Sequence, residues 1–297
     1  MRIIEERRSL LVPIVMVLFF FNTCHLQVMS CPMQTTNCTD QDRKLLEFPL
    51  NLEYLEAEFF LFGALGFGLD TVAPSLTMGG PSPIGAQIAN LDRLTRDIVL
   101  QFAWQEVGHL RAIKKTVKGF ARPLLDLSKK SFAKVMDDAF GRKFVPPFDP
   151  YANSYNYLIA SYLVPYVGLT GYVGANPKLH CPASRKDAVI RTMLYARAKH
   201  IVHPYGVSVA AFTDRISDLR NKLGKRGVKD EGLVVHKAMG AEENVAGNVL
   251  VGDKMSLAFD RTPEEILRIV YGTGNESIPG GFYPKGADGE IAKSYLD

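Results

Sequence analysis

The chain has few cysteines, little net charge and none of the common nucleotide or hydrolase motifs. Four cysteines in 297 residues are too few for a disulfide framework or a Cys-rich zinc site. The 35 basic and 31 acidic residues are interspersed and leave a net charge of +4, so we expect no nucleic-acid partner. No Gly-x-Ser-x-Gly elbow occurs, and no Gly-rich segment lies between a strand and a helix. The hydrophobic content of 47% is instead typical of a globular chain with a substantial core.

Residues 1–30 have the pattern of a secretory signal peptide. Arg2, Arg7 and Arg8 precede the apolar run 10–21, and small residues near Ser30 offer a cleavage site. The apolar run is short for a bilayer span, although an uncleaved anchor is the alternative interpretation. We therefore expect a secreted protein with no transmembrane span once the signal is removed.

Secretion would make the cysteines and two short motifs meaningful. In an oxidising compartment a bridge between Cys38 and Cys181 is allowed, and the sequence leaves open whether it forms. Asn37 and Asn275 each begin a glycosylation sequon. We expect these two asparagines to carry glycans if the chain enters the secretory pathway.

The spacing of apolar residues predicts an all-α domain over residues 42–224. Helix start and stop signals place helices at 42–66 with Pro49 near the start as a kink or a late first-turn position, 92–118, 128–141, 151–172 with a bend at Pro165, 185–203 and 207–223. Residues 74–83 are rich in Gly and Pro and are expected to be loop. Because an alternating pattern is nowhere sustained, we predict a helical bundle with accessory helices and no sheet.

A different composition begins at residue 225. Residues 225–297 are Gly-rich, and we expect them to be a mostly irregular extension packed on the bundle. One short helix is predicted at 263–271, where Thr262 and Glu265 can form a capping box around Pro263.

The helix predicted at 92–118 points two polar groups toward the core. At about 100° per residue, Glu106 and His109 share one arc with Val99, Phe102 and Leu110. An unpaired carboxylate or imidazole in an apolar interior costs several kcal/mol, so a compensating partner is expected. In helical bundles a Glu-x-x-His at i, i+3 often meets this need by binding a metal ion.

The helix predicted at 42–66 offers further carboxylates. Glu56 lies near the centre of its apolar arc, Glu53 lies on the edge, and Glu58 falls well away from it. An inward Glu from one helix and a Glu-x-x-His from the next make half of a carboxylate-bridged di-metal site. The predicted metal ligands are therefore Glu56, Glu106 and His109, with Glu53 as a further candidate. The alternative is that these groups hydrogen-bond to one another or to a neighbouring Arg or Tyr without a metal.

Four segments resemble one known family. These are LEFPLNLEYLEAEFF at 46–60, FAWQEVGH at 102–109, GFARPLLDL at 119–127 and GGFYPKGAD at 280–288. They are similar to the plant desiccation-related proteins with a ferritin-like domain, from about residue 40 to the C-terminus. The resemblance implies a ferritin-like four-helix bundle in a secreted or cell-wall-associated protein that accumulates under water deficit.

The second half of a di-metal site departs from the family pattern. The resemblance implies another helical segment with an inward Glu where only residues 180–186 stand, and a Glu where this chain has Ala196. His200 and His203 share a helical face with Ala196 and could substitute, but lone histidines on a helix near a proline stop are more often ordinary, partly exposed residues. A full site needs about four carboxylates and two histidines, so a two-iron centre is not expected here.

Three functions follow from this reading. The first is a structural or protective stress protein with a degenerate carboxylate and histidine site and no complete catalytic constellation. The second is a protein that binds Fe or Mn, with sequestration or oxidase-type chemistry. The third is an interaction module at the cell wall, favoured by the sequons and by the irregular residues 225–297. Further copies of the chain are the other partner considered.

Overall fold

The computed structural model describes residues 40–175 and 186–296, and Asp40–Asp297 forms one compact unit. The predicted signal peptide, Asn37, Cys38, Cys181 and residues 180–185 of the short connection lie outside the described residues.

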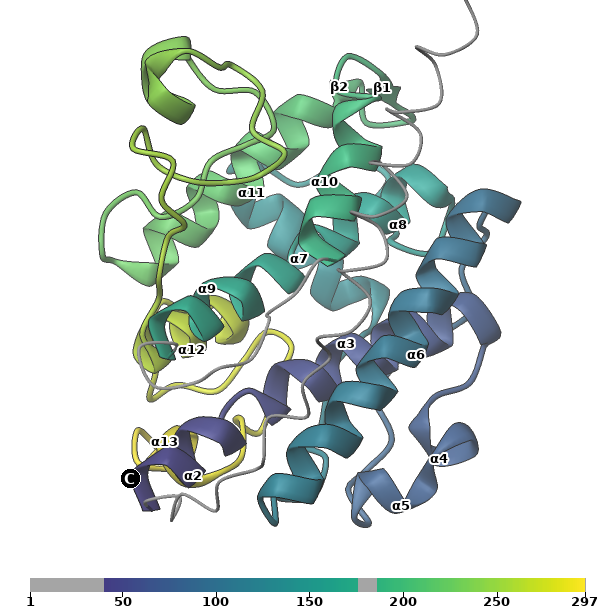
Figure 1. The fold of residues 1–297 in the computed structure, drawn as a ribbon. Helices are drawn as coiled ribbons and strands as arrows, with labels where there is room; N and C mark the ends of the chain where they lie inside the picture. The colour runs from purple at the N-terminus through teal and green to yellow at the C-terminus, as the bar shows by residue number, and fades with distance from the viewer. Residues whose placement is uncertain (1–39, 176–185, 297) are drawn as a thin grey trace, which may run out of the picture. The chain divides into compact units, whose positions relative to one another are not determined.

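The described chain is almost entirely helical (Figure 1). Its elements are α2 (Asp40–Glu47), α3 (Leu50–Leu65), α4 (Leu69–Val72), α5 (Pro74–Thr77), α6 (Arg93–Thr116), α7 (Lys129–Phe140), α8 (Ser154–Ser161), α9 (Pro165–Ala175), α10 (Lys186–Tyr195), β1 (Ile201–Val202), β2 (Val207–Ser208), α11 (Val209–Gly224), the 3₁₀ turns η2 (Lys237–Met239) and η3 (Ala241–Glu243), α12 (Pro263–Tyr271) and α13 (Glu290–Lys293). The all-α prediction is confirmed.

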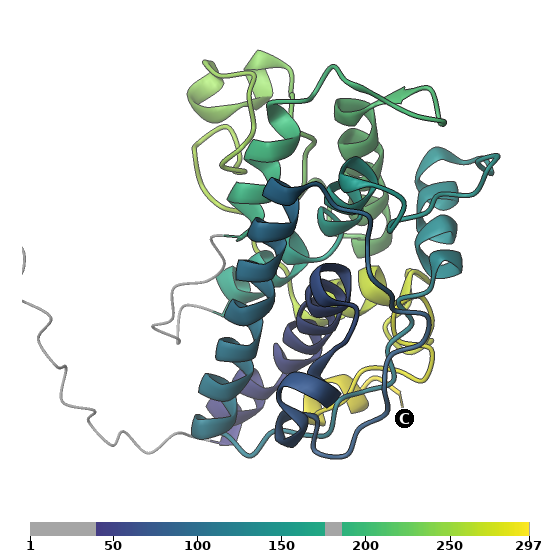
Figure 2. The same cartoon turned by 90° about the vertical axis from the view of Figure 1, so that its right-hand side faces the viewer.

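Helix α3 lies at the centre and packs chiefly against α6, which runs beside it in Figures 1 and 2. Fourteen residues of α3 are buried, so this helix has no solvent-exposed face. Gly63 lets α8 come close, because a Cβ there would lie only 2.0 Å from the hydroxyl oxygen of Tyr157. That hydroxyl donates to the carbonyl of Phe59, and the two rings stack with centroids 4.6 Å apart.

Several predicted boundaries are wrong. The first helix is divided at Phe48 and Pro49, because proline has no N–H to continue the hydrogen-bond ladder. The predicted loop at 74–83 begins with the helical turn α5, where Pro74 occupies a first-turn position that needs no N–H. The C-terminal extension contains α13 as well as the predicted helix α12, whose capping box is present.

The helix predicted at 185–203 is also shorter than expected. Helix α10 ends at Tyr195, and residues 201–208 form an antiparallel hairpin in which Ile201 pairs with Ser208. His200 therefore lies before a strand, exposed, with its ring stacked on Tyr155 at 4.4 Å. His203 is exposed in the hairpin turn. Both histidines lie beyond the end of α10, as Ala196 does, so the helical face that the sequence predicts for these three residues does not form.

Glu58, which the sequence placed away from the core, is fully buried. Its carboxylate pairs with the guanidinium of Arg122, which is also buried and donates to both carboxylate oxygens of Asp70 at 2.8 and 2.9 Å. Arg122 also donates to the carbonyls of Pro81 and Gly80. The prediction failed because α3 is enclosed on every side, so a position off the apolar arc still faces protein.

Three buried arginines join the extension to the bundle. The guanidinium carbons of Arg191, Arg220 and Arg261 lie 5.8, 5.1 and 5.9 Å from the ring centroid of Tyr166. Arg220 pairs with the buried carboxylate of Asp230, and Arg261 lies 3.9 Å from it. The network connects α9, α10 and α11 to residues 230 and 261, as expected for an extension packed on the bundle.

The end of the extension returns to the start of α3. The side-chain amide of Asn51 donates to the carbonyl of Asp288, and the backbone N–H of Asp288 donates back to Asn51, both at 2.8 Å. The hydroxyl of Tyr283 donates to the carbonyl of Asn51 at 2.8 Å. These bonds satisfy polar groups at the beginning of the central helix.

Among the described residues, Ser154–Ala175 is long and apolar enough to pass as a membrane span by length and composition. Two thirds of its most apolar stretch (67%) is buried within the protein. Since the core helices of globular domains pass the same test, this finding is weak evidence for a span.

Asp187, beside the arginine network, gives a prediction of pH dependence. Burial raises the pKa of its carboxyl from 3.8 to about 6, against the attraction of Arg191 and Arg220, and its Oδ1 has no hydrogen-bond partner. A carboxyl whose pKa is higher in the folded state stabilises the fold when protonated, and this contribution is lost as the pH rises from about 4 through 6. Asp187→Asn should therefore be more stable than the parent protein by about 2 to 3 kcal/mol at pH 7 and nearly equal to it at pH 4.

Urea unfolding of both proteins at pH 4, 5, 6 and 7 measures this difference. Asp97→Asn on the exposed side of α6 is the control and should show no such trend. If Asp187→Asn were the less stable protein at pH 7, the attraction of the arginines would outweigh the cost of burial, contrary to this prediction.

Candidate metal centre

Three predicted ligands converge between α3 and α6. His109 Nδ1 lies 3.0 Å from Glu53 Oε2 and 3.2 Å from Glu106 Oε2. One ligand atom from each of the three residues falls within 4.8 Å of the other two. Glu53, the candidate from the edge of the arc, thus lies directly in the cluster.

The local sequence explains this geometry. Helix α6 begins at Asp92, whose carboxylate accepts the backbone N–H of Thr95, and it continues without interruption to Thr116. Because Glu106 and His109 are three positions apart, their side chains project from the same turn toward α3. Glu106 is fully buried, whereas the imidazole of His109 is 34% exposed. The cluster therefore has a buried carboxylate end and an imidazole end that reaches solvent.

The two carboxylates favour a positive charge between them. The pKa of His109 is raised, chiefly by its hydrogen bond to Glu53 and also by the charges of Glu53 and Glu56, against the opposing effect of burial. Ionised carboxylate oxygens only accept hydrogen bonds, so His109 Nδ1 must carry a proton to donate to Glu53 and Glu106. A proton at this position occupies the place that a cation would take.

Glu53 is held in position from a third helix. The hydroxyl of Tyr172, on α9, donates to Glu53 Oε1 at 2.6 Å, which leaves Oε2 turned toward His109. Tyr172 is not among the predicted site residues. Helix α9 contains a second tyrosine, Tyr166, and no local pattern distinguishes the one that reaches Glu53.

Glu56 is buried but stands outside this group of three. It is 5% exposed, and its Oε1 would lie 3.2 Å from a Cβ placed on Gly168. Glycine at 168 thus leaves room for the carboxylate beside α9. Glu56 contributes its charge to His109 rather than a ligand atom within the cluster.

The donor set fits one divalent ion. Two carboxylate oxygens and one imidazole nitrogen suit Fe or Mn, and water can complete the coordination shell. A two-metal centre needs about twice as many ligands. Within residues 40–175 and 186–296, no second group of three His, Cys, Asp or Glu side chains converges in this way.

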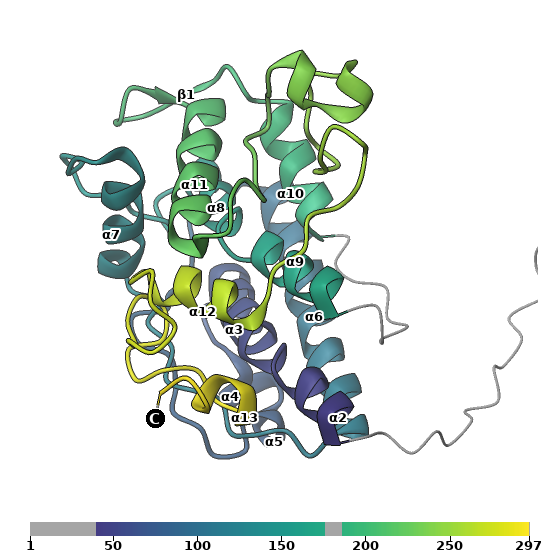
Figure 3. The same cartoon turned by 90° about the vertical axis from the view of Figure 1, so that its left-hand side faces the viewer.

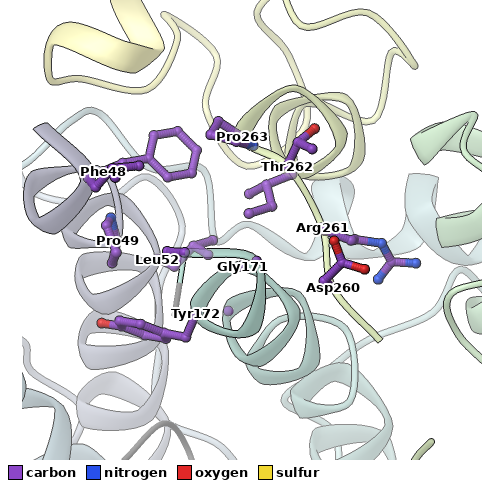
Figure 4. A pocket seen from close by; sticks show the side chains of 14 residues that line it. Phe48, Pro49, Leu52, Gly171, Tyr172, Asp260, Arg261, Thr262 and Pro263 are labelled. Atoms are coloured by element: carbon purple, nitrogen blue, oxygen red, sulfur yellow. The ribbon is translucent and has the colours of Figure 1, made fainter. Parts of the chain in front are cut away.

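A small pocket ends at the tyrosine that holds Glu53. It encloses about 120 Å³ between α3, α9 and α12, with Leu52, Gly171 and Ile266 among its lining residues. Figure 4 shows the ring of Tyr172 at its wall, with the hydroxyl turned toward α3. A molecule in this pocket would contact the Tyr172 ring and remain separated from Glu53.

Comparisons with known proteins agree with this architecture. The chain matches the family described as the Ferritin-like domain over residues 41–200. The chain belongs to this family. The desiccation-related protein PCC13-62 of Craterostigma plantagineum is 59% identical over 261 residues, which cover 84% of this chain and 83% of that protein.

A second relative of the ferritin-like chain has an enzyme's name. The ferritin-like catalase Nec2 of Nesocodon mauritianus is 53% identical over 300 residues, covering 95% of this chain and 96% of that protein. No solved structure matches. The predicted family and the ferritin-like helical fold are thus confirmed, and the protein is a homologue of a desiccation-related protein.

Proposed function

We propose that this stress-related ferritin-like protein binds one Fe or Mn ion through Glu53, Glu106 and His109. The observation that carries the proposal is that one ligand atom from each side chain lies within 4.8 Å of the other two. Such a site is degenerate relative to the di-metal pattern, but it is sufficient for a single ion completed by water.

The surrounding residues support binding in distinct ways. His109 must give up the proton shared with the carboxylates before Nδ1 can coordinate, so affinity should fall as the pH drops below the His109 pKa. Tyr172 orients Glu53 through its hydrogen bond, as groups next to metal ligands commonly do. Glu56 adds negative charge close to the site.

A second candidate function is the disproportionation of hydrogen peroxide to water and oxygen. The relative named as a ferritin-like catalase, at 53% identity, is the observation that favours it. A bound redox metal would supply the electron exchange. The alternative without metal is a protective role in which Glu53, Glu106, His109 and Tyr172 stabilise the bundle through their hydrogen bonds alone.

We also propose that the protein is secreted, with residues 1–30 removed and Asn275 glycosylated; Asn37 is the second candidate acceptor. Asn275 lies in a turn in which its side-chain oxygen accepts the N–H of Ser277, two residues later in the sequon. Mass spectrometry of the protein recovered from plant-cell medium identifies the mature N-terminus and shows whether each asparagine carries a glycan. Residue 1 still present in the exported protein, or absence of the protein from the medium, would contradict this proposal.

Metal analysis tests the site. After anaerobic loading with Fe(II) or Mn(II) and desalting, the parent protein should retain about one equivalent, and Glu106→Gln below about a tenth. Tyr172→Phe removes only the hydroxyl that orients Glu53 and should weaken binding about 10- to 100-fold. Asp97→Asn, an exposed carboxylate on the same helix, is the matched control and should load fully.

Two outcomes would contradict these proposals. Less than about a tenth of an equivalent in the parent protein would reject the metal site and favour the protective role. Catalysis at this site predicts that the loaded parent protein and loaded Asp97→Asn release oxygen from peroxide and that Glu106→Gln does not. Loss of oxygen release in Asp97→Asn, or equal release by Glu106→Gln, would contradict it.

A further inference from the structure

A large basic groove lies between α7 and α11, on the side of the protein shown in Figure 3, where these helices stand side by side. It has a volume of about 1030 Å³. Its lining includes two acidic residues and the six basic residues Lys129, Lys130, Lys134, Arg142, Lys143 and Lys222. In a chain with a net charge of only +4, this is a marked local excess of positive charge.

The acidic side chains of the groove are already engaged. Asp138 pairs with Lys134 at 2.6 Å, and Asp137 Oδ1 accepts the backbone N–H of Phe144 at 2.9 Å. Lys129 pairs with Asp149, which lies outside the lining, at 2.7 Å. The six cations of the lining outnumber its two carboxylates, so the groove keeps an excess of positive charge.

Four cations are left to face an external partner. Lys130, Arg142, Lys143 and Lys222 are exposed and form no ion pair with any residue in the described part of the chain. They come from three places: α7, the segment after its C-terminal end, and α11. A ligand that met all four would have to be extended and carry several negative charges.

Apolar surface separates these cations in the lining of the groove. Ala133, Gly141, Pro147, Leu219 and Leu223 contribute to it, together with the aliphatic stems of the lysines. This mixture suits a polymer that alternates apolar C–H faces with carboxylates, as an acidic sugar chain does. It suits a compact anion less well, because the charges are spread over α7, the segment that follows it and α11.

Nucleic acid and membrane fit the groove poorly. Single-stranded nucleic acid needs exposed aromatic rings for stacking, but Phe144, the one aromatic side chain of the lining, is 4% exposed and packs against Phe140 and Tyr205. A planar bilayer does not enter a concave groove.

We propose that the groove between α7 and α11 binds an acidic polysaccharide whose carboxylates are held by Lys130, Arg142, Lys143 and Lys222. The binding is electrostatic and salt-sensitive, since the four cations are solvated. It does not depend on the metal site, which lies between α3 and α6.

Binding of polygalacturonate to the full secreted chain, measured by calorimetry at low ionic strength, tests the proposal. The triple variant Lys130→Glu, Lys143→Glu, Lys222→Glu should weaken binding at least tenfold. The matched control Lys115→Glu, Lys199→Glu, Lys237→Glu makes the same change of net charge at exposed lysines outside the groove and should weaken it less than threefold. Circular dichroism and thermal unfolding of each variant establish that it is folded.

Four outcomes decide the matter. Selective loss in the groove variant, with binding abolished at high salt, supports the proposal. Equal weakening by both triple variants would mean attraction to net charge alone and would overturn it. Absence of binding by the parent protein, or tighter binding to single-stranded DNA or anionic lipid vesicles than to polygalacturonate, would overturn it as well.

Discussion

Replacing Arg122 by methionine is expected to lower the free energy of unfolding by about 3 to 5 kcal/mol. Arg122 and Glu58 are both fully buried, so loss of the guanidinium leaves a carboxylate inside the protein without its cation. Burial already raises the pKa of Glu58 even with Arg122 present, so its carboxyl would bind a proton more readily in the variant. Asp70 would lose the same partner at smaller cost, because its side chain is 44% exposed.

Chemical denaturation measures the effect, and two further variants interpret it. Arg268→Met breaks a more exposed pair with Glu276 and should cost at most about 1 kcal/mol. The double variant Arg122→Met, Glu58→Leu removes both charges and should recover much of the lost stability. A double variant no more stable than Arg122→Met would show that the hydrogen bonds of Arg122 to Pro81 and Gly80 matter more than its charge.

Substitution of Gly63 by alanine should destabilise the protein by about 3 kcal/mol, although alanine normally favours a helix. The new Cβ would lie 2.0 Å from the hydroxyl oxygen and 2.3 Å from the Cζ of Tyr157. Tyr157 is itself fully buried and cannot move aside without losing its hydrogen bond to Phe59. The overlap must therefore be relieved by separating α3 from α8.

Gly108→Ala is the matched control for this substitution. Gly108 lies within α6, and a Cβ there would meet nothing within 4 Å. The same change should stabilise the protein by about 0.5 to 1 kcal/mol through helix propensity alone. Thermal and urea unfolding of both variants compare the two sites, and equal stability changes would contradict the close packing of Tyr157 on α3.

The sequence predicted α6 and its inward pair well because this helix has one exposed face. Its apolar residues recur with helical spacing, so the direction of Glu106 and His109 could be calculated, and the structure places them together. Helix α3 has no exposed face, so its periodicity carried little information. That is why Glu53 was ranked below Glu56, and why Glu58 was placed away from the core.

Other features depend on contacts that no local pattern records. The helix predicted at 185–203 stops at Tyr195, and a hairpin follows. The burial of Arg191, Arg220 and Arg261 around Tyr166 arises only when four segments meet. A lone arginine in a sequence gives no sign that it will be enclosed.

The bonds between Asn51 and the C-terminal segment bear on how the protein is made. Tyr283 and Asp288 complete polar groups of α3 that emerge from the ribosome more than two hundred residues earlier. Joining such distant parts requires a large loop to close, which slows folding and prolongs exposure of apolar surface. The polar groups at the start of α3 therefore cannot gain these partners until translation has nearly ended, and we expect the nascent chain to be most prone to aggregation during this interval.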